Sequence, residues 1–565
     1  MSHSPPGFDD PKSPAFHSVA TSAYAGSPEY GTFNGSGRDD SNHLDVNNDL
    51  VTVVEDRDLK RGLAQRHLSM LGIAGAIGTG LFLGLGSAVQ TAGPLGALLG
   101  YFTVGLVVCA VQFALGEVSA LLPVTGSFVR HAEFLVDPAL GFAIGWNLVY
   151  GNILSIPSEI TAICVLFQFW TDLNPAVFII IFIVLTVIVG VAFIRVYGEV
   201  EFVFAILKIL LVVFLIILGL VIDLGGIPGT PAIGGKFWRD PGPFVEHIGS
   251  GHWGEFLGYW SVMTGAVFSF AGVESLAMAA AETKNPRRAI PAACKRVFFR
   301  IVIFYVLAIV IVGLLVASND DHLNDSSGSA AQSPFVIAAS AAGIPAIPSV
   351  VNAIVITSAW SSSNQSLLAG TRVLYGLALK KQAPKIFLRT TSWGVPYVCV
   401  LFFVPFMFLS FLTLSNAALT VFWWLVDLTA AGVLVSWSAI LLNHIRLKLA
   451  MKRQGIPNES LPWNNSWTLY SSYAGLFMSL LILLTGGYEV FTKGNWDAQS
   501  FVSSYLDIPL VLSAYLIWKL WKKTKIVSLS EISLDEAFKQ AEQAPDDEPP
   551  VKKGTWIRLV SWIWD

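Results

Sequence analysis

Five ionisable side chains lie inside long apolar runs of the sequence, where water is scarce. They are Glu117, Glu159, Lys208, Glu274 and Asp427. Such groups are rare in membrane-spanning segments, and where they occur they usually pair with one another, bind ions or relay protons. These residue types therefore indicate the reversible binding of protons or charged solutes.

The sequence lacks the residue patterns of common catalytic sites. Neither HExxH nor GxSxG occurs, and the histidines are scattered. The cysteines show neither CxxC spacing nor a neighbouring histidine, so they indicate no zinc site and no disulfide framework; they are Cys109, Cys164, Cys294 and Cys399. We expect no enzyme activity, no cofactor and no metal.

Glycines interrupt two of the apolar runs. Residues 75–82 read GAIGTGLF, and residues 268–275 read FSFAGVES. Broken helices at corresponding positions of two repeats mark a binding site near the membrane midplane, because unpaired backbone is tolerated there only around a cavity. The alternative is that such glycines are small residues at helix contacts, which suits Gly100 and Gly105 better. We favour a break in both runs, and in the second run because of Glu274.

Composition indicates that the chain is dissolved in a bilayer. Of its 565 residues, 54% are hydrophobic and 13% are charged, whereas an average soluble domain has about 25% charged residues. Apolar runs of roughly 20 residues, the length that spans a bilayer, recur from Leu68 to Trp521. Nothing in the chain is basic enough to predict nucleic-acid binding. We expect an all-α polytopic protein within the lipid bilayer.

Hydropathy predicts about twelve transmembrane helices between two polar tails. The expected starts are Leu68, Leu95, Leu140, Ala176, Phe202, Leu257, Val297, Ser349, Pro396, Leu419, Thr468 and Phe501. The predicted parts are a disordered N-terminal tail over residues 1–66, a transmembrane domain over 67–522 and a C-terminal tail over 523–565. The first tail lacks the apolar core of a signal peptide.

Lysine and arginine collect in alternate loops between the expected spans. The other set of loops holds only Lys236, Arg239 and Lys493. Positive residues stay on the cytosolic side, so both termini are expected in the cytosol. Asn324, in an Asn-Asp-Ser triplet, is then a candidate for extracellular glycosylation.

Motifs spread over residues 55 to 525 resemble those of the yeast amino acid transporter family, the fungal permeases of the amino acid-polyamine-organocation superfamily. They are Arg66-His67 before the GAIGTGLF run, Thr91 to Gly96, Gly116-Glu117, Pro123 to Phe128, Gly141 to Asn147, Pro157 to Glu159, Tyr197 to Phe202, Phe270 to Glu274, Glu282 to Arg287, and His444 to Arg446. The resemblance implies a LeuT-type fold, with two inverted five-helix repeats plus two further helices. It also implies proton-driven import of L-amino acids across the plasma membrane by alternating access.

An amino acid would suit the two helix interruptions. Its carboxylate would meet the N–H groups of the half-helix after Ile77, and its ammonium the carbonyl groups of the half-helix that ends near Phe270. The expected substrate-binding residues are Ala76, Ile77, Gly78, Thr79, Gly80, Phe268, Phe270, Ala271 and Gly272. By the resemblance, Phe268 and Phe270 form an aromatic lid over the substrate; the alternative is simple packing.

Proton coupling or gating is assigned to Lys208, Glu274, Glu117 and Glu159. The resemblance implies that the ammonium group of Lys208 replaces the sodium ion of sodium-coupled relatives; the alternative is a lysine that extends to the interface near Glu201. Glu117 is equally suited to pairing with nearby basic loops.

Side-chain selectivity is assigned to Asp427 and Glu159. An ionised acid near the pocket would favour basic substrates and reject acidic ones. A broad-range permease for neutral amino acids is equally compatible with the sequence.

The two tails bear on partner proteins and not on transport. The resemblance implies turnover by the ubiquitin machinery, with Lys12 and Lys60 as candidates, and an endoplasmic reticulum packaging chaperone. Trp556, Trp562 and Trp564 suit either a helix at the membrane interface or packing against the bundle. The competing functions are an amino acid exchanger and a non-transporting nutrient sensor, although sensors of this family tend to have longer tails.

Overall fold

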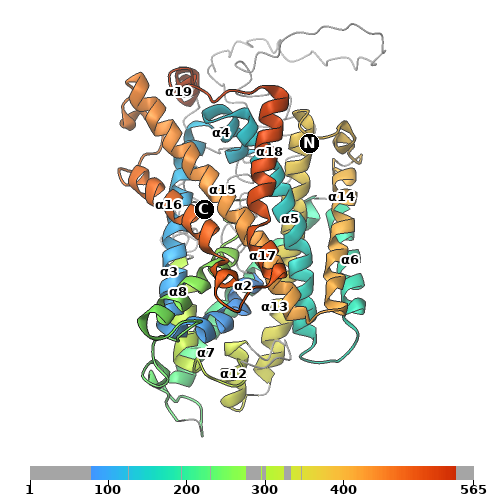
Figure 1. Ribbon diagram of the computed structural model, residues 1–565. Helices are drawn as coiled ribbons and strands as arrows, with labels where there is room; N and C mark the ends of the chain where they lie inside the picture. Colours follow the sequence, from blue (N-terminus) through green and yellow to red (C-terminus); the bar gives the residue numbers. More distant parts are fainter. Residues whose placement is uncertain are drawn as a thin grey trace, which may run out of the picture. The chain divides into compact units, whose positions relative to one another are not determined.

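Long apolar helices dominate the structure, as hydropathy predicts. The computed structural model describes residues 78–124, 126–191, 194–229, 231–274, 294, 301–323, 333–344, 346–392 and 394–542 (Figure 1). These ranges contain helices and loops, without a strand. Several sequence predictions lie outside the described residues: the tail over residues 1–66, Ala76, Ile77, Asn324 and the three C-terminal tryptophans.

The helices follow the order of the expected spans. They are α2 (Thr79–Phe82), α3 (Gly84–Leu121), α4 (Ser127–Leu135), α5 (Pro138–Phe167), α6 (Pro175–Val191), α7 (Ile194–Asp223), η1 (Lys236–Trp238), α8 (Gly251–Ser269), η2 (Ile301–Val306), α11 (Leu307–Leu315), α12 (Pro334–Ala341), α13 (Ala346–Leu379), η4 (Lys385–Leu388), α14 (Tyr397–Met407), η5 (Phe408–Leu414), α15 (Ala418–Gln454), η6 (Asn458–Ser460), α16 (Thr468–Thr485), η7 (Tyr488–Phe491), α17 (Ala498–Tyr505), α18 (Asp507–Lys522) and α19 (Leu534–Glu542).

Among the described residues, 6 helices are long and apolar enough to cross a membrane, and the bent pair α17–α18 makes up to 7. Two shorter apolar helices, Pro175–Val191 and Phe304–Leu315, coincide with further expected spans. Helix α13 is long, but its middle is polar because residues 361–366 read SSSNQS. These helices confirm the predicted polytopic helical membrane fold.

Helix α5 lies at the centre of the packing. It packs most extensively against α13 and α15, and α3 packs in the same way against α8. In Figure 1, α15 crosses α5 obliquely. Large side chains such as Tyr101, Tyr305, Phe403 and Trp437 are fully buried inside the helical bundle. The contacts of α5 therefore determine where its polar side chains lie.

A kink in α3 separates the first two expected spans. Gly93 has a φ of 76° there and is followed by Pro94. A β-carbon at Gly93 would lie 2.7 Å from the carbonyl oxygen of Pro243, so glycine is required for both conformation and space. The amide of Leu95 donates to the same carbonyl over 2.9 Å. The segment before α8 thus fixes the turn that precedes the predicted second span.

The first part of the C-terminal tail packs on the helical bundle. Ile532, Leu534 and Ala537 are buried in an apolar cluster with residues of α3, α4 and α15. The amide of Val527 donates to the carbonyl of Val136 over 2.9 Å, and Gln454 donates to the carbonyls of Leu529 and Ile532. The surface formed by α4 and the tail residues Val527, Leu529, Ile532, Leu534 and Ala537 is called the α4 face below.

Asp137 joins the start of α5 to the end of α18. Its carboxylate accepts hydrogen bonds from the amide of Ala139 (2.9 Å), from Thr524 (2.8 Å) and from Tyr515 (3.2 Å), and it pairs with Lys519. Burial alone would raise the pKa of Asp137, but Lys519 and the other donors outweigh burial and hold this pKa below its usual range. The group is therefore ionised at neutral pH.

We expect Asp137→Asn to lower the free energy of unfolding by about 2 kcal/mol, since it leaves Lys519 without its partner. Because the folded pKa is depressed, the stabilisation is complete above the unfolded value of about 3.9. It is lost as the pH falls through the lower folded value. Thermal unfolding of the purified protein at neutral pH measures the effect. Asp321→Asn, at an exposed position, is the control, and equal unfolding temperatures for the two variants would contradict the assignment.

Candidate functional site

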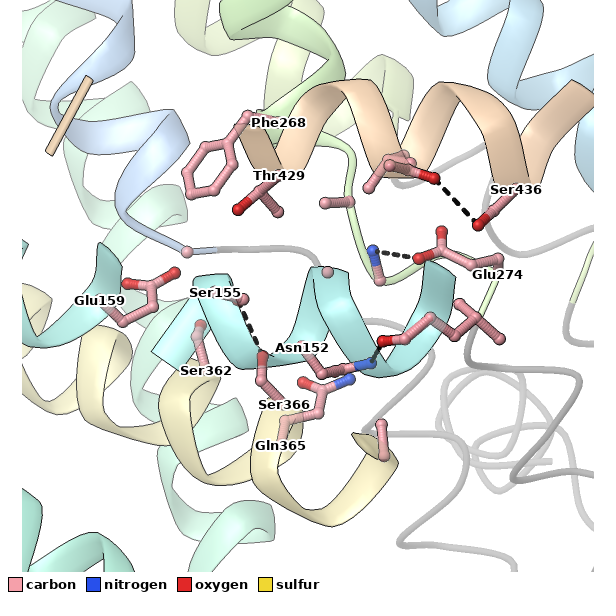
Figure 2. A pocket seen from close by; sticks show the side chains of 18 of the residues that line it. Asn152, Ser155, Glu159, Phe268, Glu274, Ser362, Gln365, Ser366, Thr429 and Ser436 are labelled. Atoms are coloured by element: carbon pink, nitrogen blue, oxygen red, sulfur yellow. Dashed lines mark hydrogen bonds between the residues drawn. The ribbon is translucent and has the colours of Figure 1, made fainter. Parts of the chain in front are cut away.

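A cavity lies between the two helix interruptions. Gly78 and Gly80 line it from the start of α2, and Phe268, Ala271 and Gly272 line it from the end of α8 and the turn that follows. Helices α5, α13 and α15 provide the remaining walls (Figure 2). Five of the predicted substrate-binding residues therefore meet at one place.

The interruption after α8 is a turn held by side chains of other helices. Helix α8 ends at Ser269, and Gly272 has a φ of 91°. Gln112 of α3 donates to the carbonyl of Val273 over 2.9 Å, while Tyr305 donates to the carbonyl of Ser269 over 2.6 Å. Because buried backbone groups need partners, these two side chains make the predicted break possible.

Glu274 stabilises the same turn through hydrogen bonds. Its carboxylate accepts from the amide of Gly272 over 3.2 Å and from the indole of Trp437 over 3.2 Å. The side chain is buried and lines the cavity. Glu274 thus connects the turn after α8 to α15.

The first interruption is described from Gly78 onwards. A helix begins at Thr79, with Gly78 in an extended conformation as its N-cap. A β-carbon at Gly80 would lie 2.9 Å from the Cα of Ser269, so α2 and α8 touch there through backbone atoms. The predicted break is consistent with this helix start.

Glu159 of α5 lies beside the start of α2. Thr79 donates a hydrogen bond to its carboxylate over 2.9 Å, so the Thr79 hydroxyl is directed towards α5 rather than into the cavity. A β-carbon at Gly78 would lie 3.4 Å from the same carboxylate. Glu159 is buried and lines the cavity.

Polar side chains of α5, α13 and α15 complete the cavity, and none of them was predicted from the sequence as a site residue. They are Asn147, Asn152 and Ser155 of α5, Ser362, Gln365 and Ser366 of α13, and Thr429 and Ser436 of α15 (Figure 2). Ser155 and Ser366 are hydrogen-bonded over 2.9 Å. The described lining residues include no lysine or arginine. The SSSNQS run within an expected span was the available signal.

The two predicted lid residues point to different places. Phe268 lines the cavity and packs edge-on against Phe422. Phe270 is completely buried against Tyr305, with ring centroids 4.3 Å apart, and does not line the cavity. Of these two residues, Phe268 alone lines the cavity.

Lys208 is fully buried behind the cavity wall. Its Nζ atom lies 4.0 Å from Glu201, two turns earlier in α7, and Glu201 accepts a hydrogen bond of 2.5 Å from Ser361 of α13. Glu159 is close enough to influence Lys208 electrostatically. The lysine thus lies between two acids, of which Glu159 reaches the cavity.

Glu117 does not line the cavity. It is buried in a network near the α4 face, where it accepts from the amide of Asn465 (2.9 Å) and pairs with His444 (2.9 Å) and Lys448 (2.8 Å). This geometry ties α3 to α15 and to the segment before α16.

Asp427 lines a second cavity and not the first. Its carboxylate accepts from Ser503 over 3.4 Å. Glu489 lines the same cavity and accepts from His247 (2.9 Å) and Ser261 (2.6 Å). Burial would raise the pKa of Glu489, but these donors outweigh it and keep this pKa below its usual range.

The chain is similar in sequence to a known protein family and to several of its members. A family model described as amino acid permease matches residues 67–531. The chain is 37% identical over 521 residues to the proline-specific permease of Emericella nidulans, covering 90% of this chain and 94% of that protein. It is 34% identical over 525 residues to the dicarboxylic amino acid permease of Saccharomyces cerevisiae, covering 92% of this chain and 85% of that protein.

A third relative is the cationic amino acid transporter 1 of Schizosaccharomyces pombe, with 36% identity over 517 residues, covering 90% of this chain and 86% of the relative. Among solved structures, a manganese transporter of Eremococcus coleocola has a TM-score of 0.52 at 12% identity, covering 81% of this chain and 94% of that one. That likeness concerns the fold alone and supports the expected LeuT-type arrangement.

Proposed function

Because the chain belongs to the amino acid permease family, a family of transporters and not of enzymes, we propose that it imports L-amino acids together with protons. The transport would cross the plasma membrane by alternating access. The observation that carries the proposal is the cavity between the two helix interruptions. It brings a helix start, a helix end and buried acids to one place.

The substrate backbone would lie across the two interruptions. Its carboxylate would accept from the amides of Gly78 and Gly80 at the helix start, where the partial positive charge of the helix is located. Its ammonium group would lie near the carbonyl end of α8 and Gly272. Ala76 and Ile77 remain proposed contacts on the same grounds.

Proton coupling would run through the acids around Lys208. A proton that leaves Lys208 changes the charge beside Glu159, and Glu159 both lines the cavity and holds Thr79. Glu274 would gate the cavity through its bonds to the turn and to Trp437. Glu117 would act further away, by holding α3 to α15 during the conformational change.

The lining of the cavity favours neutral or basic side chains. Glu159 and Glu274 line it, and the described lining residues contribute no cation. An acidic substrate would meet like charges, which costs several kcal/mol when they are desolvated. Glu159 is better placed than Asp427 for this selection, since Asp427 lines the second cavity.

The remaining parts of the proposal rest on the sequence. The positive-inside pattern supports cytosolic termini, and the family supports partners in the ubiquitin machinery and an endoplasmic reticulum packaging chaperone. An amino acid exchanger and a non-transporting nutrient sensor are the alternative functions.

Phe268 and Phe270 provide a matched pair of variants. We expect Phe268→Ala to raise the KM for uptake about tenfold, by removing a substrate contact worth about 1.4 kcal/mol. We expect Phe270→Ala to destabilise the protein by about 3 to 5 kcal/mol, since it empties a buried site. Uptake kinetics and thermal unfolding measured on both variants check the pair. The reverse pattern, with KM changed only by Phe270→Ala, would overturn the placement of the lid.

Competition uptake in a permease-deficient yeast tests the proposed function and its substrate class. Cells that produce the full chain take up a labelled neutral amino acid while acidic, basic, aromatic and small neutral amino acids compete. We expect neutral or basic competitors to act and acidic ones to act least. Correct surface expression without uptake of any amino acid would favour the sensor.

A further inference from the structure

Asp507 is a buried carboxylate without a donor among the described residues. It is the first residue of α18, after a 45° bend between α17 and α18. Its side chain is 1% exposed, and neither carboxylate oxygen has a hydrogen-bond partner in the part of the chain that the structure describes. Buried polar groups are normally paired, so this exception calls for a ligand or a proton.

Two other oxygen atoms in this region also lack hydrogen-bond partners within the described ranges. They are Oδ1 of Asn147 and the hydroxyl of Tyr150, both on α5. The position that a β-carbon of Gly432 would occupy lies 3.3 Å from Oδ1 of Asn147 and 3.9 Å from Oδ1 of Asp507. Both oxygens therefore lie beside the bare backbone of Gly432.

No basic side chain compensates the charge of Asp507 among the described residues. The titratable group that α5 contributes is Tyr150, which is near enough to be influenced by the charge of Asp507. From α15, Asp427 faces Ser503 of α17 and the second cavity. Lys519, on α18 itself, pairs with Asp137. An ionised Asp507 would thus be a buried charge without a counter-ion, which is strongly unfavourable.

A proton bound to Asp507 would remove this uncompensated buried charge. The carboxylate of an ionised Asp507 and the amide oxygen of Asn147 are both acceptors, so neither can satisfy the other. Protonated, Asp507 becomes a donor that can satisfy the amide oxygen of Asn147. The other end of the Asn147 amide already donates to the carbonyl of Gly432 (2.8 Å) and to the hydroxyl of Ser436 (3.2 Å). Gly432 and Ser436 both line the first cavity.

We propose that Asp507 is a proton-binding site, linked to substrate occupancy through Asn147 and the wall formed by Gly432 and Ser436. The inference rests on the proposed function and extends it, because α18 lies outside the two five-helix repeats. Asp507 is a positioning residue here: it acts on the cavity wall through Asn147 and does not touch the substrate.

Infrared difference spectroscopy tests proton binding directly, with protons as the only ligand. The purified full-length protein is titrated from acidic to alkaline pH in buffer free of sodium and potassium. We expect the wild type to show a carbonyl band of a protonated carboxylic acid that Asp507→Asn lacks and that Asp321→Asn retains. An unchanged spectrum for Asp507→Asn would overturn the proposal. Loss of the band on adding sodium or potassium at constant pH would also overturn it, in favour of an inorganic cation.

The link to substrate is tested by uptake in proteoliposomes, with L-alanine, L-proline and L-lysine as probes. We expect the wild-type KM to change about tenfold between acidic and alkaline external pH, corresponding to about 1.4 kcal/mol. Asp507→Asn, a permanent donor, should keep substrate counterflow but lose most of this pH dependence, and Asp507→Glu should restore it. An unchanged pH profile in Asp507→Asn overturns the link. If the wild type carries none of the three probes, the proposed preference for neutral or basic amino acids fails, while the infrared result still decides proton binding.

Discussion

Gly80→Ala is expected to lower the initial rate of amino acid uptake by a factor of about a hundred, since misplacing binding groups by about 1 Å has effects of this size. The added methyl group would lie 2.7 Å from the hydroxyl oxygen and 2.9 Å from the Cα of Ser269, and 3.1 Å from the ring of Phe268. A backbone atom cannot rotate away, so α2 and α8 must separate. That separation moves the amides at the start of α2 and the carbonyl groups at the end of α8, which are proposed to bind the substrate backbone.

Gly376→Ala is the matched control for this variant. Gly376 lies in α13, and a β-carbon there would meet nothing within 4 Å. Both variants are compared by uptake rate per molecule at the cell surface. A Gly80→Ala rate close to the Gly376→Ala rate would show that the contact between α2 and α8 does not position the substrate.

Lys208→Ala is expected to retain exchange of substrate across the membrane but to reduce accumulation of substrate against a gradient. Removing the ammonium group takes away a buried charge between Glu201 and Glu159, and with it the proposed proton carrier. The cavity lining itself is unchanged, because Lys208 is not part of it. Counterflow of substrate should therefore persist, while accumulation driven by a pH gradient should fall about tenfold, equivalent to about 1.4 kcal/mol of lost coupling.

Stability is the necessary control for that result. Lys208→Ala leaves Glu201 with Ser361 but without its cation, which is unfavourable for a buried acid. The double variant Lys208→Ala with Glu201→Gln removes both charges and should recover stability without recovering accumulation. Undiminished accumulation in Lys208→Ala would refute the coupling role of this lysine.

The helices, the helix start at Thr79 and the helix end at Ser269 were predictable because each leaves a local signal. Apolar runs of spanning length are recognisable without knowledge of their neighbours. The glycines at 78, 80 and 272 and the acid at 274 mark places where an uninterrupted apolar helix is unfavourable. Those positions line the cavity in the structure.

The orientation of side chains around each helix was not predictable. Phe268 and Phe270 are two residues apart, yet one lines the cavity and the other packs against Tyr305. Asp427 and Gly432 belong to the same helix but line different cavities. In helices that are apolar on nearly all sides, hydropathy carries no information on which face is turned to the cavity.

Partners distant in the sequence were also beyond prediction. Glu117 meets His444 and Lys448 only because α3 packs against α15. Asp507 has neither an acidic nor a basic neighbour in sequence that would distinguish it from a residue at a helix start. Its significance comes from burial and from the unpaired oxygens of Asn147 and Tyr150, which belong to another helix.

Accumulation of labelled amino acids in proteoliposomes with an imposed pH gradient tests the central claim most directly. The purified full-length protein is reconstituted with an acidic exterior, and each of the common amino acids is offered in turn. We predict that at least one neutral or basic amino acid accumulates above equilibrium and that a protonophore abolishes the accumulation. Exchange without accumulation would contradict proton symport, and absence of both for every amino acid would contradict transport itself.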